Sequence, residues 1–334
     1  MYKTDLSKSK SRIFKIRFLF NNRLRILVFI GTICLAPALS AEPLRIVSQN
    51  LNRFYDDVNN NRKYERVLTA RQFKKRVDDT SKKIISDFKL ADIIAFQEVE
   101  NANVLSNISS HLLNKTAIHY RPILLPGNDI SGINVGYLVK KNLSIRNSKQ
   151  LFRDVKSPIN GAALFSRPPL LIEVCAKQAC ISLLNLHLRS MRGMRQGKSS
   201  TRIRLKRYEQ ANKIAEWIED FQQSSPNKSI MLLGDMNAFH RSDGYVDVIG
   251  TLIGNPVKTN IELKSPDRIT TDLIDITANI PKYRRYSHIY KKRKQQLDYM
   301  LTNSKFKPVL NHISFGEIDY SISDHAYLMA EFDW

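Results

Sequence analysis

The stretch Ser229-Ile-Met-Leu-Leu-Gly-Asp-Met-Asn-Ala238 has the pattern of a buried β-strand that ends in a polar turn. Its unbroken apolar run is typical of a strand that is covered on both faces. Asp235 and Asn237 come directly after this run, two residues apart, so their side chains share one face of an extended chain. Covered sheets place functional sites at such strand ends. We therefore expect one of these side chains to orient a nucleophile while the other donates to a phosphate.

Two more segments end strand-like runs with polar groups. Glu98 closes a buried apolar run, where a carboxylate is costly unless it meets a cation, and magnesium prefers oxygen ligands. In Leu184-Asn-Leu-His-Leu-Arg-Ser190, Asn185 and His187 alternate with leucines and so point to one face, and Arg189 follows them. Each segment also has a simpler explanation, since Glu98 alone could be a solvated strand end and a lone His is more often structural.

The remaining polar positions lie near the two ends of the chain. Asn50 ends the first strand-like run, where an amide can hold a carboxylate or a phosphate oxygen, although Asn there is more often a turn residue. Asp324 and His325 are adjacent before the last strand, and such a pair can supply a metal ligand and a general base. Asp298 places another carboxylate at a strand.

Helical and extended patterns mix along the chain. Spaced apolar positions predict helices over 67–89, 101–113 and 199–222. Apolar or alternating runs predict strands at 44–49, 91–97, 119–125, 132–140, 143–150, 229–234, 296–302 and 326–333, and a hairpin over 169–187. Residues 256–295 are expected to be irregular, with short strand-like pieces. The expected fold class is α/β (α+β): a four-layer sandwich of two packed mixed β-sheets with helices on both outer faces.

In this order and spacing, the polar segments resemble the endonuclease/exonuclease/phosphatase superfamily over residues 44–333. Gly-Asp-Met-Asn-Ala at 234–238 and Ser-Asp-His at 323–325 are the most specific motifs. Phe165-Ser-Arg-Pro-Pro169, and His187 where the repair nucleases carry a tyrosine, look like deoxyribonuclease I. The stretch 71–98 is similar to secreted bacterial nucleases of the superfamily. The resemblance implies metal-dependent hydrolysis of phosphodiester bonds.

The resemblance also implies a role for each residue. The metal site would be formed by Asn50, Glu98 and Asp324, and would hold magnesium, with manganese or calcium as alternatives. The catalytic residues would be His187, Asp235, Asn237, Asp298 and His325, with the two histidines as acid or base and Asp298 supporting one of them. The substrate-binding residues would be Arg167, Asn185 and Arg189. Asn52 stands where the repair nucleases often carry an Asp, which leaves the number of metal ions open.

The first 41 residues predict a signal peptide, so that residues 42–334 form the catalytic domain. Met1 to Arg25 carries eight Lys or Arg, and an apolar run from Ile26 leads to small residues that end at Ala41. An uncleaved N-terminal anchor is the alternative. We expect a secreted or periplasmic protein with no stable membrane insertion after cleavage, and by default a monomer.

Cys175 and Cys180 flank a four-residue turn between two strand-like runs. In an oxidising compartment this spacing suits a disulfide that closes a hairpin, and a Cys-only zinc site would need more ligands.

Charge favours a polyanionic substrate. Without residues 1–41, 45 Lys and Arg face 30 Asp and Glu, a net charge of +15. Eight basic residues and no acid lie between Arg189 and Arg207, and seven more lie between Lys282 and Lys294, interleaved with tyrosines. Both stretches adjoin an expected catalytic segment, where cations can neutralise phosphates and tyrosines can stack on bases. The expected partner is therefore nucleic acid, with DNA preferred.

Three other functions compete with a nuclease. A secreted phospholipid phosphodiesterase resembling a sphingomyelinase, or a phosphatase, belongs to the same superfamily. The phospholipid enzyme would need an exposed apolar, aromatic hairpin, and the sequence offers only the basic stretch 282–294. A binding protein with a decayed site is hard to reconcile with the filled polar positions.

Overall fold

The computed structural model describes residues 43–176, 179–197, 199–306 and 309–333. The expected signal peptide at 1–41 lies outside the described residues. The described residues belong to one compact unit, residues 41–334.

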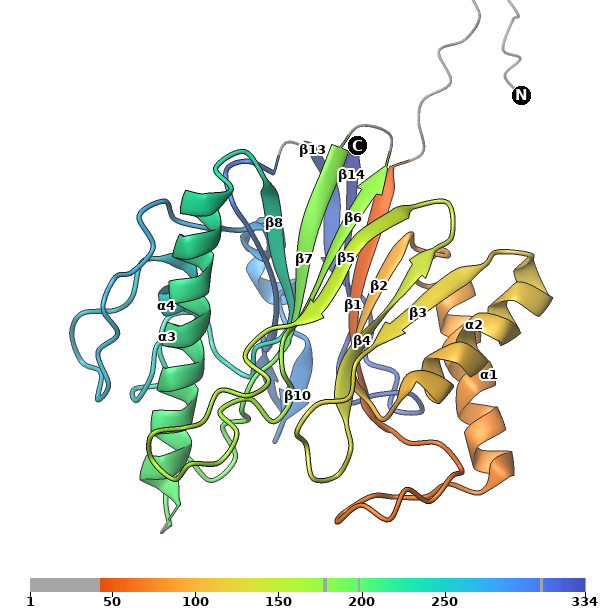
Figure 1. Ribbon diagram of the computed structural model, residues 1–334, viewed down its shortest axis with the longest axis horizontal. Helices are drawn as coiled ribbons and strands as arrows, with labels where there is room; N and C mark the ends of the chain where they lie inside the picture. The colour runs from red at the N-terminus through yellow and green to blue at the C-terminus, as the bar shows by residue number, and fades with distance from the viewer. Residues whose placement is uncertain (1–42, 177–178, 198, 307–308, 334) are drawn as a thin grey trace, which may run out of the picture. The chain divides into compact units, whose positions relative to one another are not determined.

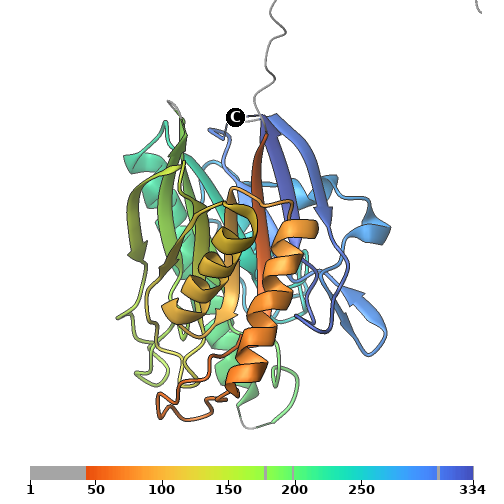
Figure 2. The same ribbon diagram turned by 90° about the vertical axis from the view of Figure 1, so that its right-hand side faces the viewer.

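The first six-stranded sheet has the order β13-β14-β1-β2-β4-β3. Its strands are β1 (Leu44–Phe54), β2 (Ile93–Val99), β3 (Tyr120–Leu124), β4 (Asn134–Lys140), β13 (Val309–Phe315) and β14 (Leu328–Asp333). β1 and β2 are parallel and the other pairs are antiparallel, so the sheet is mixed. Helices α1 (Ala70–Ser86) and α2 (Ala102–Thr116) cover its outer face, as Figure 2 shows. Asn101 caps α2, as the sequence predicts.

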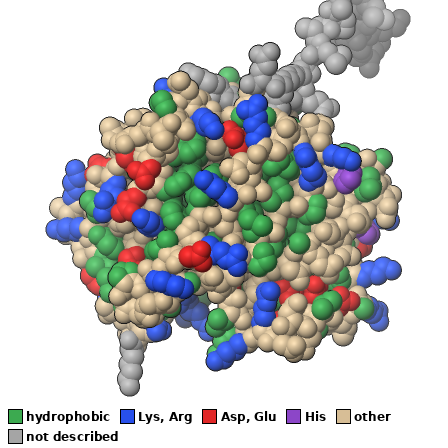
Figure 3. All heavy atoms as spheres, in the orientation of Figure 1, with side chains coloured by type: hydrophobic (Ala, Val, Ile, Leu, Met, Phe, Trp, Pro, Cys, Tyr) green, Lys and Arg blue, Asp and Glu red, His purple; other side chains and the backbone are tan. Residues whose placement is uncertain are grey.

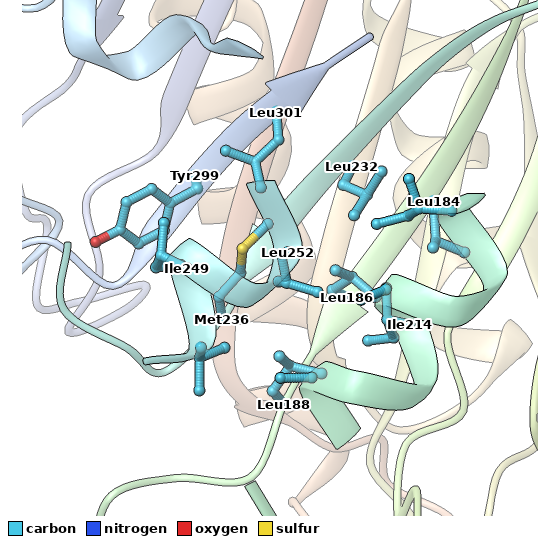
Figure 4. Close-up of a cluster of buried hydrophobic side chains, with 14 of the residues drawn as sticks. Leu184, Leu186, Leu188, Ile214, Leu232, Met236, Ile249, Leu252, Tyr299 and Leu301 are labelled. Atoms are coloured by element: carbon cyan, nitrogen blue, oxygen red, sulfur yellow. The ribbon is translucent and has the colours of Figure 1, made fainter. Parts of the chain in front are cut away.

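The second six-stranded sheet has the order β5-β6-β7-β8-β12-β9. Its strands are β5 (Ser144–Gln150), β6 (Leu170–Ala176), β7 (Ala179–His187), β8 (Ser229–Asp235), β9 (Ile274–Asp275) and β12 (Asp298–Thr302). Helices α3 (Ser200–Ser224) and α4 (Val248–Ile253) pack on its outer face. Figure 4 shows the cluster beneath them, in which Leu184, Leu186 and Leu188 meet Ile214 of α3.

The inner faces of the two sheets pack against each other, which completes the four layers seen in Figure 1. Along β8, Met231 and Leu233 enter this inter-sheet core, whereas Leu232 faces the helices. Because side chains alternate along a strand, Asp235 continues the inner row and ends it with a carboxylate. The same alternation puts the ends of β7 and β12 on the inner face, so the apolar core between the sheets ends in a polar cluster.

The expected four-layer architecture is confirmed, and so is the disulfide between Cys175 and Cys180, which are paired across β6 and β7. One strand was not predicted: β13 is an edge strand with three exposed residues of seven, and polar residues interrupt its apolar positions. Short strands were expected within the irregular stretch 256–295, where the hairpin of β10 (His288–Tyr290) and β11 (Arg293–Gln295) lies beside the short 3₁₀ turns η1 (Ile276–Asn279) and η2 (Lys282–Arg284). Among the described helices, none combines the length and the apolar character that a membrane crossing requires.

Candidate active site

A buried polar layer joins the two sheets just beneath the site. Asn185 on β7 donates from Nδ2 to the carbonyls of Phe96 and Gly136, each at 3.0 Å. Its Oδ1 accepts from Gln97 Nε2 at 2.7 Å. Asn185 was expected to bind substrate, but it is fully buried, and both N–H groups and the oxygen of its amide form hydrogen bonds within the protein. In the structure it links the two sheets and lies two positions before His187 on β7.

An irregularity in β2 brings Glu98 to the inner face. Ile94 and Phe96 point toward the helices, so strict alternation would send Glu98 the same way. Glu98 has a left-handed backbone (φ 59°), and the register between β2 and β4 shifts between Gln97 and Val99. Its Oε1 consequently lies 3.3 Å from Asn50 Nδ2 and 3.7 Å from His187 Nε2. Such backbones cost about 1–3 kcal/mol and are concentrated at functional sites.

Asp235 is the centre of the cluster. Its Oδ2 accepts from Asn50 Nδ2 at 3.1 Å and lies 3.5 Å from His187 Nε2 and 3.9 Å from His325 Nε2. Burial is the main cause that raises the pKa of Asp235 to about 7; Asp298 and Glu98 add to the rise and His325 opposes it. Side chains from β1, β7 and the segment before β14 therefore converge on one carboxylate at the end of β8.

The two histidines that flank Asp235 are held in opposite charge states. Burial lowers the pKa of His187 well below 6.5, and the positive charges of Arg167 and His325 lower it further. Burial also opposes charge on His325, but Asp298 and Asp235 outweigh it and raise the pKa of His325 to about 10. The Asp298 carboxylate contacts His325 Nδ1 at 2.8 Å. At neutral pH the site thus combines a neutral imidazole with an imidazolium, an arrangement typical of acid–base pairs.

The donor set fits a divalent cation. Asp235, Asp298 and His325 place one ligand atom each within 4.8 Å of one another. Because a protonated imidazole cannot bind a metal, the carboxylates of Asp235 and Asp298 are the donors of this group that a cation can use. Glu98 adds a third carboxylate at the partly exposed side of the cluster, where Asn50 presents its Nδ2 while its Oδ1 accepts from the Asn52 N–H. Asp298 Oδ1 is buried with no hydrogen-bond partner among the described residues. Several carboxylate oxygens close together suit a hard cation such as magnesium.

Asp324 lies apart from this cluster. Its side chain is 45% exposed and its Oδ2 is 3.7 Å from His288 Nε2. This contact holds the pKa of Asp324 below its usual range. The ring of His288 in turn packs on His325, with centroids 5.1 Å apart. Asp324 was expected to be a metal ligand, but in the structure its carboxylate contacts His288 and not the cluster around Asp235. His288 was not predicted, and its only signal was its place in a Tyr-rich, basic stretch next to Asp298.

Arg167 holds the loop that follows β7. Arg167 donates to the carbonyls of His187 and Leu188 at 3.3 and 3.1 Å, and pairs with Asp129 at 3.1 Å. Its guanidinium therefore fixes the loop beside His187.

Arg207 of α3 holds the turn that follows β8. The fully buried Arg207 donates to the carbonyls of Arg189 and Asn237 at 2.6 and 2.7 Å. Asn237 has φ 49° and donates from its backbone to Asp235 Oδ1 at 2.9 Å and from Nδ2 to the Leu188 carbonyl at 3.3 Å. Arg207 was missed because its partners are carbonyls about 20 and 30 residues away, which no local pattern reveals.

The profile of the Endonuclease/Exonuclease/phosphatase family matches residues 48–301. The chain belongs to this family. That assignment places it in a group of phosphodiesterases, phosphatases and nucleases that hydrolyse phosphoester bonds.

Solved structures with the same fold are distant in sequence. TDP2 of D. rerio, complexed with a single-strand DNA product, is 15% identical; the match covers 87% of this chain and 98% of that one, with a TM-score of 0.55. The human Nocturnin catalytic domain is 14% identical, with 87% and 94% coverage and a TM-score of 0.52. ANGEL2, a 2',3'-cyclic phosphatase, is 15% identical, with 87% and 95% coverage and a TM-score of 0.55. A comparison with curated protein sequences found no significant match.

Proposed function

We propose that this member of the family is an exported, metal-dependent nuclease that hydrolyses phosphodiester bonds of nucleic acid, with DNA as its preferred substrate. The observation that carries the proposal is the arrangement around Asp235: a neutral His187 and a charged His325 lie 3.5 and 3.9 Å from the same carboxylate oxygen. A phosphodiester needs a water activated on one side and charge stabilised on the phosphoryl oxygens, and this pair of histidines supplies both kinds of group.

Each residue has a task that follows from its position. Asp235 and Asn237 orient the attacking water and a phosphoryl oxygen, since Asp235 is central and Asn237 is fixed to it through its backbone N–H. His187 accepts a proton, because its imidazole is neutral. His325 donates to the phosphoryl group as negative charge grows in the pentavalent transition state. Asp298 keeps the His325 ring oriented and charged.

A divalent cation fits beside Glu98 and the shared carboxylate of Asp235, which would hold it, and Asn50 would join them with its amide turned so that Oδ1 faces the ion. When bound, the ion polarises the phosphate and stabilises negative charge. Magnesium is the proposed ion, with manganese and calcium to be compared in assays.

The β10–β11 hairpin supports a nucleic-acid substrate. The hairpin lies beside the site, because an isolated antiparallel β-bridge pairs the backbones of His288 and His325. Tyr283 and Tyr290 are 70% and 54% exposed, and Lys294 lies 4.2 Å from the ring of Tyr286. Cations beside exposed aromatic rings can neutralise a backbone and stack on bases. TDP2 of D. rerio, with its single-strand DNA product, shows that this fold can accept DNA.

The disulfide supports export. Cys175 and Cys180 form a bond that is typical of oxidising compartments, and the signal-like segment at 1–41 agrees with it. We propose that the mature protein is secreted or periplasmic and monomeric.

A substrate panel tests this proposal. Residues 42–334, purified under oxidising conditions, are incubated with supercoiled plasmid, single-stranded DNA, RNA, sphingomyelin and p-nitrophenyl phosphate, each with magnesium and with EDTA. The proposal predicts EDTA-sensitive cleavage of nucleic acid, with DNA cut faster than RNA. Hydrolysis of sphingomyelin without cleavage of nucleic acid would assign the phospholipid alternative, and hydrolysis of the monoester alone would assign a phosphatase.

A further inference from the structure

A concave site lies between the loop that follows β7 and the first turns of α3. It has a cavity of about 350 Å³ whose lining includes Ser166, Arg189, Arg202, Ile203 and Lys206. We call it the α3 pocket. None of the candidate catalytic residues lines it, but Arg189 follows His187 by only two positions in the chain.

No ion pair neutralises the cations of the α3 pocket. Among the described residues, no carboxylate lies within 4.0 Å of Arg189, Arg202 or Lys206, although the charge of Asp129 favours the charged form of Lys206 from further away. Other cations of α3 are paired: Arg204 with Glu262 at 2.7 Å and Arg207 with Asp243 at 3.2 Å. Lys and Arg side chains are scattered over the face shown in Figure 3, with Asp and Glu among them, so net charge alone does not locate a binding site. Cations that line a cavity and have no carboxylate partner within 4.0 Å are a more specific indication of an anion-binding site.

The pocket also keeps these cations close together. Lys206 Nζ donates to the Ala163 carbonyl at 3.0 Å and to Ser166 Oγ at 3.4 Å, both neutral acceptors. Burial, followed by the charges of Arg167 and Arg189, lowers the pKa of Lys206 to about 8. Burial, Arg167 and Arg202 likewise lower the pKa of Arg189. Mutual repulsion of this kind is relieved when an anion binds.

The start of α3 adds to the positive field. Ser199 precedes the helix and makes no side-chain hydrogen bond to it, in contrast to the side-chain caps of α1, α2 and α4. Arg202 and Ile203 belong to the first turn of α3, where the helix dipole favours negative charge. The dipole alone would not define a site, but it favours negative charge at the same end of α3 as the three cations.

We propose that the α3 pocket binds a backbone phosphate of the nucleic-acid strand, next to the phosphate that is cleaved. The inference rests on the proposed function and specifies the substrate: a polynucleotide that carries flanking phosphates, in preference to a compound with one phosphodiester. Two peptide units separate the backbones of His187 and Arg189 by at most about 7 Å. A strand with one phosphate at His187 therefore presents a neighbouring phosphate to Arg189, Arg202 and Lys206.

Binding tests the pocket without relying on catalysis. Arg202→Gln/Lys206→Gln is made in a His187→Ala background, and its affinity for a fluorescent single-stranded DNA is measured by anisotropy over a range of salt concentrations. Loss of charged hydrogen bonds predicts affinity that is weaker by ~10–100-fold. The slope of log affinity against log salt is expected to fall by about 0.7 for each phosphate contact removed.

A matched variant controls for net charge. Lys115→Gln/Lys141→Gln removes the same charge from exposed positions, at the C-terminal end of α2 and just after β4, away from the site. This control should bind DNA like the His187→Ala parent. With His187 restored, the pocket variant should lose kcat/KM for the oligonucleotide while its kcat/KM for a dinucleotide with one phosphodiester stays close to the wild-type value.

Three outcomes would overturn the inference. The pocket variant could bind DNA as tightly as the control variant, or lose activity on the dinucleotide and the oligonucleotide equally. Inorganic phosphate could compete as well as the oligonucleotide at equal concentration, which would assign the pocket to free phosphate. If the wild-type protein cleaves nothing but DNA binding still depends on the pocket, the proposed nuclease activity fails, and only the binding of a backbone phosphate in the pocket stands.

Discussion

Asp298 holds the His325 imidazole through a 2.8 Å contact to Nδ1 and thereby turns its Nε2 toward Asp235 at 3.9 Å. The two residues come from different parts of the fold, β12 and the segment before β14. Because Asp298 is buried and contacts His325, its charge can stabilise the imidazolium much more than an exposed carboxylate could.

Asp298→Asn is expected to lower kcat at least ~100-fold, by the usual size of general acid–base contributions. The sign of the pH effect follows from the pKa of His325, which is raised to about 10: the charged form is present below that pH and is lost above it. Without the Asp298 charge, this pKa falls and the alkaline decline of the rate begins at lower pH. A pH–rate profile of both proteins measures the shift, and overlapping profiles would remove Asp298 from this role.

Glu98→Gln is expected to raise the magnesium concentration needed for half-maximal activity at least ~10-fold, by analogy with effects around metal sites. The reason is that Glu98 is the partly exposed carboxylate of the cluster, next to Asn50. Activity is titrated with magnesium. Glu317→Gln, at an exposed position, is the control. Equal magnesium requirements in the two variants would argue against a cation at Glu98.

Arg207→Ala is expected to destabilise the fold by ~3–5 kcal/mol, because it leaves Asp243 buried without its charge partner. It also frees the carbonyls of Arg189 and Asn237. Urea denaturation gives the free energy of unfolding. A loss below ~1 kcal/mol would show that the pair is not a structural link, since exposed ion pairs contribute about that much.

Cys175→Ser/Cys180→Ser is expected to lower the free energy of unfolding by ~2 kcal/mol, because the disulfide closes a short loop. The disulfide joins one end of the hairpin, whereas His187 ends β7 at the other, so the rate of cleavage should not change. Thermal melts of the oxidised protein and the variant test this. An unchanged melting temperature would contradict a stabilising disulfide.

Much of the site could be predicted because it lies on strands. Alternation predicted that Asn185 and His187 share one face of their strand and that Asp235 follows a buried strand, and in the structure His187 and Asp235 pair at the ends of β7 and β8. Glu98 reaches the same place only through a left-handed residue and a register shift, which no two-residue period reveals. Asp324 was expected beside the metal, but it contacts His288 instead, and His325 alone joins the cluster.

Other parts were hidden because they depend on tertiary contacts. Arg207 looks like one more cation in a basic helix, and its burial follows only from how α3 packs on the turn after β8. The exposed edge strand β13 offers no apolar run to recognise.

The most direct test of the central claim is the rate at which the protein nicks supercoiled plasmid in magnesium, with His187→Ala and His325→Ala assayed separately. His119→Ala is the matched control, because His119 is exposed and precedes β3 at the far end of the first sheet. We predict EDTA-sensitive nicking that falls at least ~100-fold in each site variant and is unchanged in the control. Full nicking by either site variant would contradict a mechanism built on the two histidines around Asp235.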